Sequence, residues 1–121
     1  MNRMTVRILA LTAALLPAAA FAGHSDLTVP ASETFMLGGE QRAAMTVSGR
    51  NVGKTSVIVL SRSGGKDTMI ATVAPGASFE HSFAIGETAL LRNASAAAAA
   101  KLSVDFTGAP SDLSMRYAKP Q

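Results

Sequence analysis

Short runs in which apolar and polar residues alternate one by one are the feature that most constrains the fold of this chain. From Ala77 to Phe83 every second residue is apolar except His81, and Lys101–Thr107 repeats the pattern with Leu102, Val104 and Phe106. Successive side chains of a β-strand point to opposite faces, so this period of two predicts strands with one buried and one solvated face. Helical spacing is nearly absent, and the pattern therefore predicts an all-β protein.

Other strands are expected along the rest of the chain. In Ser56–Leu60 the residues from Val57 onward are apolar at every position, which predicts a central strand covered on both faces. A weak edge strand is expected at Leu27–Val29. Alternation from Leu113 to Tyr117 predicts a strand with Leu113, Met115 and Tyr117 turned inward. Further strands are predicted at Glu33–Leu37, Ala43–Ser48, Thr68–Val73 and Thr88–Asn93.

Residues that favour chain reversal separate these runs at intervals of about ten residues. We expect neighbouring strands to pair as hairpins, and we interpret the low-complexity run Ala96–Ala100 as a connector between strands. Seven to eight short strands with this spacing predict a small antiparallel two-sheet β-sandwich of the immunoglobulin-like kind. The turn and strand Asn51–Val59 resembles a segment of short bacterial immunoglobulin-like domains, and the resemblance implies the fold alone. The expected turns are Gly38-Gly39, Arg50–Gly53, Ser63–Lys66, Pro75-Gly76 and Gly108–Pro110.

The N-terminus carries the order of segments that is typical of a secretory signal peptide. Two arginines precede the apolar stretch Ile8–Leu16, and cleavage after Ala22 would place alanine at both the −1 and the −3 positions. The apolar stretch is shorter than the about 20 residues that a membrane-spanning helix needs. We therefore expect residues 1–22 to be a cleaved signal peptide and residues 23–121 to form a single β-sandwich domain. The product would be periplasmic or secreted, with no membrane span.

Charge and cysteine content exclude several classes of protein. Removal of Arg3 and Arg7 with the signal leaves nine of the eleven basic residues against eight acidic ones, and the remaining bases are scattered. Nucleic acid is therefore not an expected partner. The chain has no cysteine, which excludes disulfides, thiol catalysis, zinc thiolates and iron–sulfur clusters. Stability must come from the burial of apolar side chains.

The two histidines, His24 and His81, are the candidate metal ligands. After cleavage, His24 would be the second residue, so that the amine of Gly23, the intervening amide and the imidazole form a donor set suited to copper(II). His81 lies on the apolar face of its expected strand. There the ring needs a hydrogen-bond partner among neighbouring carbonyls, hydroxyls or carboxylates, or else it binds a metal. A copper site shared by both histidines requires that they lie close together.

Short motifs that suggest enzymes lack the context that their chemistry needs. Gly49–Thr55 has three residues between its glycines where a phosphate-binding loop has four, and a β-branched strand follows it. Ser63–Lys66 has the spacing of the penicillin-binding nucleophile, but its two glycines are a poor start for a helix and the companion motifs are missing. Asn93–Ser95 fits the glycosylation sequon and is interpreted as a turn. An enzyme is not expected.

The sequence therefore favours an exported, non-enzymatic β-sandwich that acts through its surface as an interaction or accessory module in the cell envelope. Its partner would be another envelope or secreted protein or a polymer, recognised through an exposed apolar patch or a free edge strand. The alternative is a periplasmic copper-handling protein that uses His24 and His81. An enzyme of unrecognised type would need a pocket that gathers several carboxylates from Glu33, Glu40, Glu80, Asp105 and Asp112.

Overall fold

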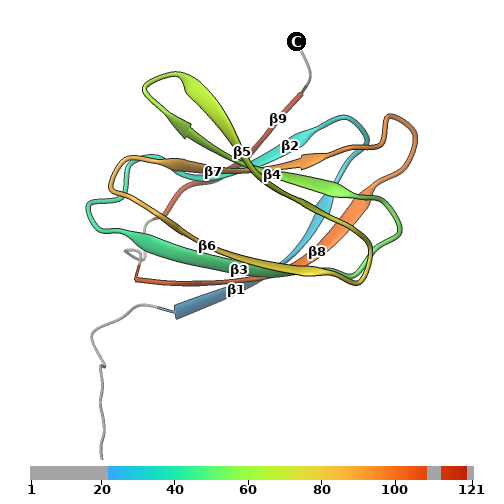
Figure 1. The fold of residues 1–121 in the computed structure, drawn as a ribbon, viewed down its shortest axis with the longest axis horizontal. Coiled ribbons are helices and arrows are strands. Elements are labelled where there is room, and N and C mark those ends of the chain that lie inside the picture. The colour runs from blue at the N-terminus through green and yellow to red at the C-terminus, as the bar shows by residue number, and fades with distance from the viewer. Residues whose placement is uncertain (1–21, 109–112, 120–121) are drawn as a thin grey trace, which may run out of the picture.

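The computed structural model describes residues 22–108 and 113–119, and there the chain forms nine strands in two antiparallel sheets that face each other as two layers (Figure 1). The predicted two-sheet β-sandwich is confirmed, with nine strands in place of seven to eight. The expected signal peptide lies outside the described residues except for Ala22, the first residue of β1. The strands are β1 (Ala22–Val29), β2 (Thr34–Gly38), β3 (Met45–Asn51), β4 (Val57–Ser63), β5 (Lys66–Val73), β6 (Ser78–Phe83), β7 (Thr88–Asn93), β8 (Ala100–Thr107) and β9 (Met115–Ala118).

The strand order shows how the chain crosses between the layers. The four-stranded sheet has the order β1-β8-β3-β6 and the five-stranded sheet the order β5-β4-β7-β2-β9. Of the strands consecutive in the described chain, β4 and β5 alone pair as a hairpin; Gly64 and Gly65 have φ of 59° and 78° in its two-residue loop. The prediction that neighbouring strands generally pair is wrong, because the turns after Asn51 and at Pro75-Gly76 lead from one sheet to the other. Turns of the same residue types therefore occur both in a hairpin and in a connection between the two sheets.

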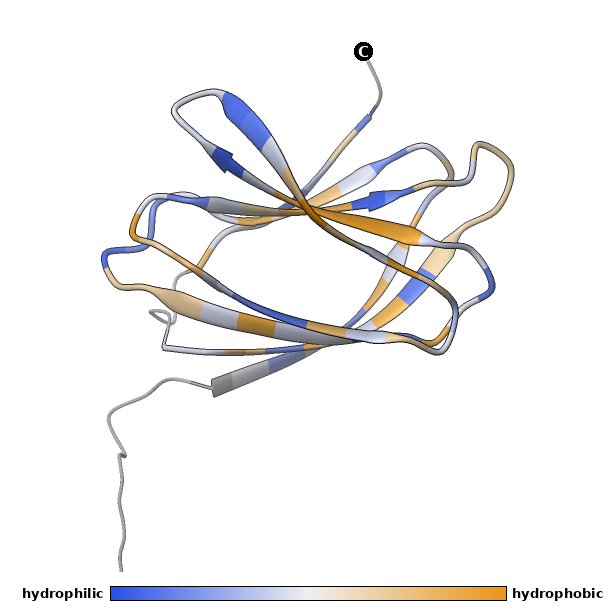
Figure 2. Cartoon of the chain, viewed as in Figure 1, coloured by the Kyte–Doolittle hydropathy of each residue, from blue (hydrophilic) through white to orange (hydrophobic). Residues whose placement is uncertain are grey.

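The alternating patterns build the core between the sheets. Along β8 the even-numbered residues Leu102, Val104 and Phe106 are buried and the residues between them lie toward solvent. The prediction of a central strand at Val57–Leu60 is confirmed: β4 lies between β5 and β7, and its early residues carry a hydrophobic colour that gives way to a hydrophilic tip (Figure 2). Val57 and Val59 are buried in the core, whereas Leu60 belongs to a second apolar cluster.

Two glycines of the four-stranded sheet leave room for aromatic rings on the paired strand. A Cβ at Gly49 would lie 2.6 Å from the ring of Phe79, and one at Gly23 would lie 2.5 Å from the ring of Phe106. Both glycines are directly opposite these phenylalanines in the register. An aromatic ring that packs over a cross-strand glycine offsets the missing side chain and fixes the register of the two strands.

The outer strands differ in length and protection. The predicted edge strand at Leu27–Val29 extends over all of β1, which pairs only with β8 in the described part of the chain. Met115 and Tyr117 of β9 are opposite the core residues Leu37 and Phe35, so they share the predicted face. They are nevertheless 44% and 49% exposed, because β9 lies at the edge of its sheet; the predicted direction of the two side chains holds, but they are not buried.

Buried polar side chains tie the loops to the sheets. Asn93 is 3% exposed, and its amide donates to the carbonyls of Val29, Pro30 and Ala98, while its oxygen accepts from the Ser95 amide and the Thr55 hydroxyl. Residues 94–99 connect β7 to β8, as predicted for Ala96–Ala100, except that Ala100 is already the first residue of β8. Among the residues with described structure, no helix is long and apolar enough to span a bilayer.

Candidate functional site

His24 lies between two carboxylates on the outer face of the four-stranded sheet. The β1–β8 register places it directly opposite Asp105, and Asp26 is the next outward-facing residue on β1. The ring nitrogen Nδ1 donates to Asp105 Oδ1 at 2.7 Å, and Nε2 donates to Asp26 Oδ1 at 3.0 Å. A carboxylate only accepts, so this arrangement is best satisfied by the imidazolium form, which carries a proton on both nitrogens.

The electrostatics of this cluster agree with that protonation state. The hydrogen bond to Asp105, and after it the bond to Asp26, raise the pKa of His24 above its ordinary value of 6.5. A metal ligand needs a neutral imidazole with a free nitrogen. Both ring nitrogens of His24 are bonded to carboxylates, Nδ1 to Asp105 and Nε2 to Asp26, so neither nitrogen is free in this arrangement. Within residues 22–108 and 113–119, no group of three or more His, Asp or Glu side chains could hold a metal ion.

His81 lies on β6, at the opposite edge of the same sheet, with β8 and β3 between it and His24. Three strand spacings correspond to about 14 Å. His24 points outward, whereas His81 points to the same side as Phe83, whose ring it meets edge-on with 4.9 Å between ring centroids. The two histidines are therefore not brought together for one shared ion. A metal role for either residue alone stays a prediction.

The surroundings of His81 differ from those that we expected. No side chain or carbonyl of the described residues forms a hydrogen bond with its ring. His81 is half-buried and opens to a cleft of about 350 Å³ between the two sheets, where Ser61, Lys66 and Glu87 also lie. Water can therefore reach the ring nitrogens. Glu87 is occupied within the fold, since its carboxylate accepts from the Ser61 hydroxyl at 3.1 Å and the Ala84 amide at 2.6 Å.

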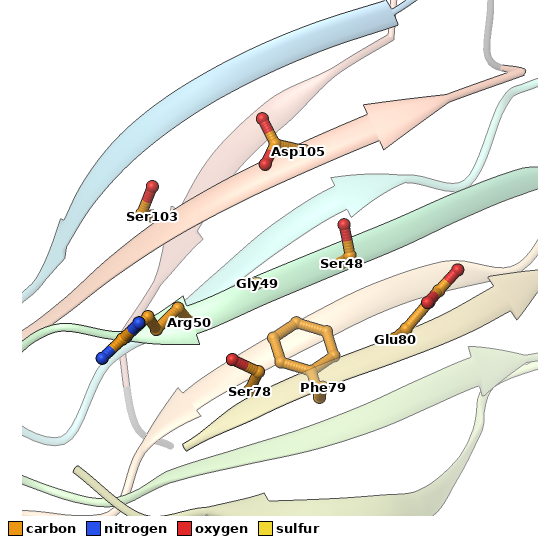
Figure 3. Close-up of a pocket in the computed structure, with 8 residues that line it drawn as sticks. All are labelled: Ser48, Gly49, Arg50, Ser78, Phe79, Glu80, Ser103 and Asp105. Carbon is orange, nitrogen blue, oxygen red and sulfur yellow. The ribbon is translucent and has the colours of Figure 1, made fainter. Parts of the chain in front are cut away.

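A shallow polar depression of about 440 Å³ marks the outer face of the four-stranded sheet (Figure 3). Its lining comes from β3, β6 and β8 and includes the carboxylates Glu80 and Asp105 and the guanidinium of Arg50. Of the carboxylates proposed for an enzyme site, these two alone line this depression, and Asp112 lies outside the described residues. Asp105 is bonded to His24, so the depression brings together two of the five carboxylates named for an enzyme site, and one of these already has a partner.

The outer face of the five-stranded sheet has a different character. Met36, Leu60 and Leu90 are buried there as a second apolar cluster, separate from the main core and packed against Ile58 and Ala118. The register explains the cluster, because Leu60 is opposite Leu90, and Leu90 is opposite Met36, on adjacent strands. Met69, opposite Leu60 on β5, continues this row and is 62% exposed. It lies on the β4–β5 hairpin, whose tip projects from the sandwich (Figure 1).

A recess of about 330 Å³ lies over this cluster and is bordered by basic side chains. Arg62 forms a two-point bond with Asp67, with contacts of 2.7 and 3.1 Å, and this bond holds the pKa of Asp67 below its usual value. The nearest carboxylate oxygen to Arg92 is also from Asp67, at 4.0 Å. Lys119 completes the basic border. We call this hollow the cationic recess; its lining residues are Ser32, Thr34, Met36, Arg62, Leu90, Arg92, Ala118 and Lys119.

Sequence reasoning did not find the cationic recess. Its apolar floor comes from the continuous apolar runs around Met36 and Leu90, in each of which one residue must point away from the core. That signal is visible in the sequence, but only the pairing of β2 with β7 brings the two residues together. Comparisons of the chain with protein-family models, curated proteins and solved structures gave no significant match.

Proposed function

We propose that the chain is an exported, non-enzymatic β-sandwich that acts as an interaction or accessory module in the cell envelope. We further propose that it contacts its partner, an envelope or secreted protein, through the outer face of the five-stranded sheet. One observation carries this proposal: Met36, Leu60 and Leu90 form an apolar cluster on a face that lies outside the main core.

The contrast between the two outer faces supports the choice of surface. The solvated face of an antiparallel sheet is normally polar, and the outer residues Ser48, Ser103 and Asp105 of the four-stranded sheet follow that rule. On the outer face of the five-stranded sheet Met36, Leu60 and Leu90 form an apolar row beside arginine side chains, and the exposed Met69 continues that row. Apolar surface rimmed by polar groups is typical of interaction sites.

Site-specific photo-crosslinking in cells of the source organism tests this proposal. A photoreactive residue replaces Met69 on the proposed face or, as the matched control, Thr28, an exposed outward-facing residue of β1 on the other sheet. We expect a discrete adduct from position 69 and a much weaker one from position 28. Equal adducts from both positions, or adducts from position 28 alone, would contradict the proposed surface.

A further inference from the structure

The cationic recess has a floor and a border of different chemistry. Leu90 and Met36 at its floor are only 1% and 8% exposed, so the apolar surface lies below the level of the surrounding side chains. A volume of about 330 Å³ is at the lower end of the about 300–1,000 Å³ of ligand pockets. An occupant that uses the floor must insert an apolar group of limited size.

The border carries more positive than negative charge. Arg62, Arg92 and Lys119 are opposed by one carboxylate, Asp67, which is bonded to Arg62. Arg92 has only the 4.0 Å approach to that carboxylate, and Lys119 has no ion pair with any described residue. Two positive charges are therefore left for an incoming anion. The hydroxyls of Ser32 and Thr34 offer further hydrogen bonds on the other border.

Three classes of anionic partner fit these features poorly. A bilayer is penetrated by apolar side chains that protrude, whereas the floor residues are sunk below the basic border. Nucleic acid needs a longer track of cations or aromatic stacking surfaces, and neither lines the recess. An anionic polysaccharide leaves the apolar floor without a complementary group. A peptide can supply a carboxylate and an apolar side chain at adjacent positions.

We infer that the cationic recess binds an acidic peptide segment of the partner protein, with an apolar side chain on Leu90 and Met36 and a carboxylate held by Arg92 and Lys119. This inference rests on the interaction role proposed above and names the chemistry of the partner.

The backbone conformation of Ser32 allows a substitution at the border of the recess that should not unfold the chain. Ser32 occupies the third position of the turn Pro30–Glu33 with a φ of 66°, where glycine is favoured, and the Glu33 amide donates to the Pro30 carbonyl at 3.0 Å. Ser32 lines the recess. Ser32→Gly therefore removes a border hydroxyl and relieves the backbone at the same time.

Nuclear magnetic resonance titration of the exported protein, purified from the periplasm, tests the inference. The probes are short peptides of alternating glutamate and leucine, lysine and leucine, or glutamate and serine, and vesicles that contain phosphatidylglycerol. The test variant is the double substitution Arg92→Gln and Lys119→Gln. The matched control is Lys54→Gln and Lys101→Gln, which removes the same charge from exposed positions away from the recess.

We expect the glutamate–leucine peptide to shift the signals of Thr34, Leu90 and Arg92. The other two peptides should bind more weakly, and the double test variant should lower the affinity about tenfold while the control pair leaves it unchanged. Ser32→Gly should weaken the binding without unfolding the chain. Equal binding of the lysine–leucine peptide, binding of vesicles alone, or an unaffected test variant would overturn the inference. If position 69 still yields its specific adduct in that case, the proposed interaction role stands and only the acidic-peptide chemistry fails.

Discussion

Replacement of Asn93 by alanine should strongly destabilise the sandwich. The side chain is 3% exposed and makes five contacts that join β7, the end of β1 and the loop before β8. A hydrogen bond contributes about 0.5–1.5 kcal/mol net, so five lost contacts correspond to about 3–7 kcal/mol. Because four of the five are only part-buried, water replaces some of them, and we expect the low end, about 3 kcal/mol. In a domain of this size the midpoint of thermal unfolding would fall by about 12–24 °C.

Urea denaturation and calorimetry of the purified protein measure this loss. Asn93→Asp keeps the volume of the side chain but replaces the donor to three carbonyls with an acceptor, so it should be at least as destabilising as Asn93→Ala. Ser95→Ala, which removes exposed contacts to the Ala97 and Ala98 amides, is the control and should cost less than about 1 kcal/mol. A stable Asn93→Asp variant, or a loss below about 1 kcal/mol for Asn93→Ala, would refute the reasoning.

Other predictions follow from features described above. The carboxylates of Asp105 and Asp26 raise the pKa of His24 above 6.5 in the folded state. The stabilisation by protonated His24 should therefore be complete below pH 6.5 and disappear as the pH rises through the raised pKa. The difference in unfolding midpoint between the native protein and His24→Gln should shrink over the same pH range. A copper(II) site at His24 should have the same affinity by calorimetry in the native protein and in His81→Ala, because the two histidines lie on opposite faces; a clear loss of affinity at that site would contradict the placement of His81. Mass spectrometry of the protein purified from its source organism should find Gly23 at the N-terminus, and any other first residue contradicts the predicted cleavage after Ala22. Ser32→Gly should raise the thermal midpoint or leave it unchanged, since glycine tolerates a φ of 66° better than serine does, and a drop of several degrees argues against the described turn.

The strands were predictable because their residues carry a local signal. The alternation in Lys101–Thr107 predicted β8 with an error of one residue at its start. The uninterrupted apolar run from Val57 predicted the central position of β4. The crossovers were not predictable, since Asn51 looks like a hairpin residue. In the structure its amide donates to the Thr55 and Val73 carbonyls and its oxygen accepts from the Gly53 amide.

The candidate sites depend on contacts between distant parts of the chain, which a local pattern does not specify. His24 and Asp105 are 81 positions apart, and only the pairing of β1 with β8 makes them neighbours. The apolar floor of the cationic recess likewise joins Met36 on β2 to Leu90 on β7. Sequence reasoning identified His24 and His81 as chemically informative residues, but it could not place them on opposite faces of one sheet.

The pairing of the first strand with the eighth has a kinetic consequence. β1 can bond to its partner only after Ala100–Thr107 has become available, so the four-stranded sheet closes late and by a long-range contact. Folds dominated by such contacts form slowly. For the export proposed above, late closure would keep the chain competent to cross a membrane unfolded until nearly all of it has crossed. The order of strands in the finished sheet would thereby delay folding until after that crossing.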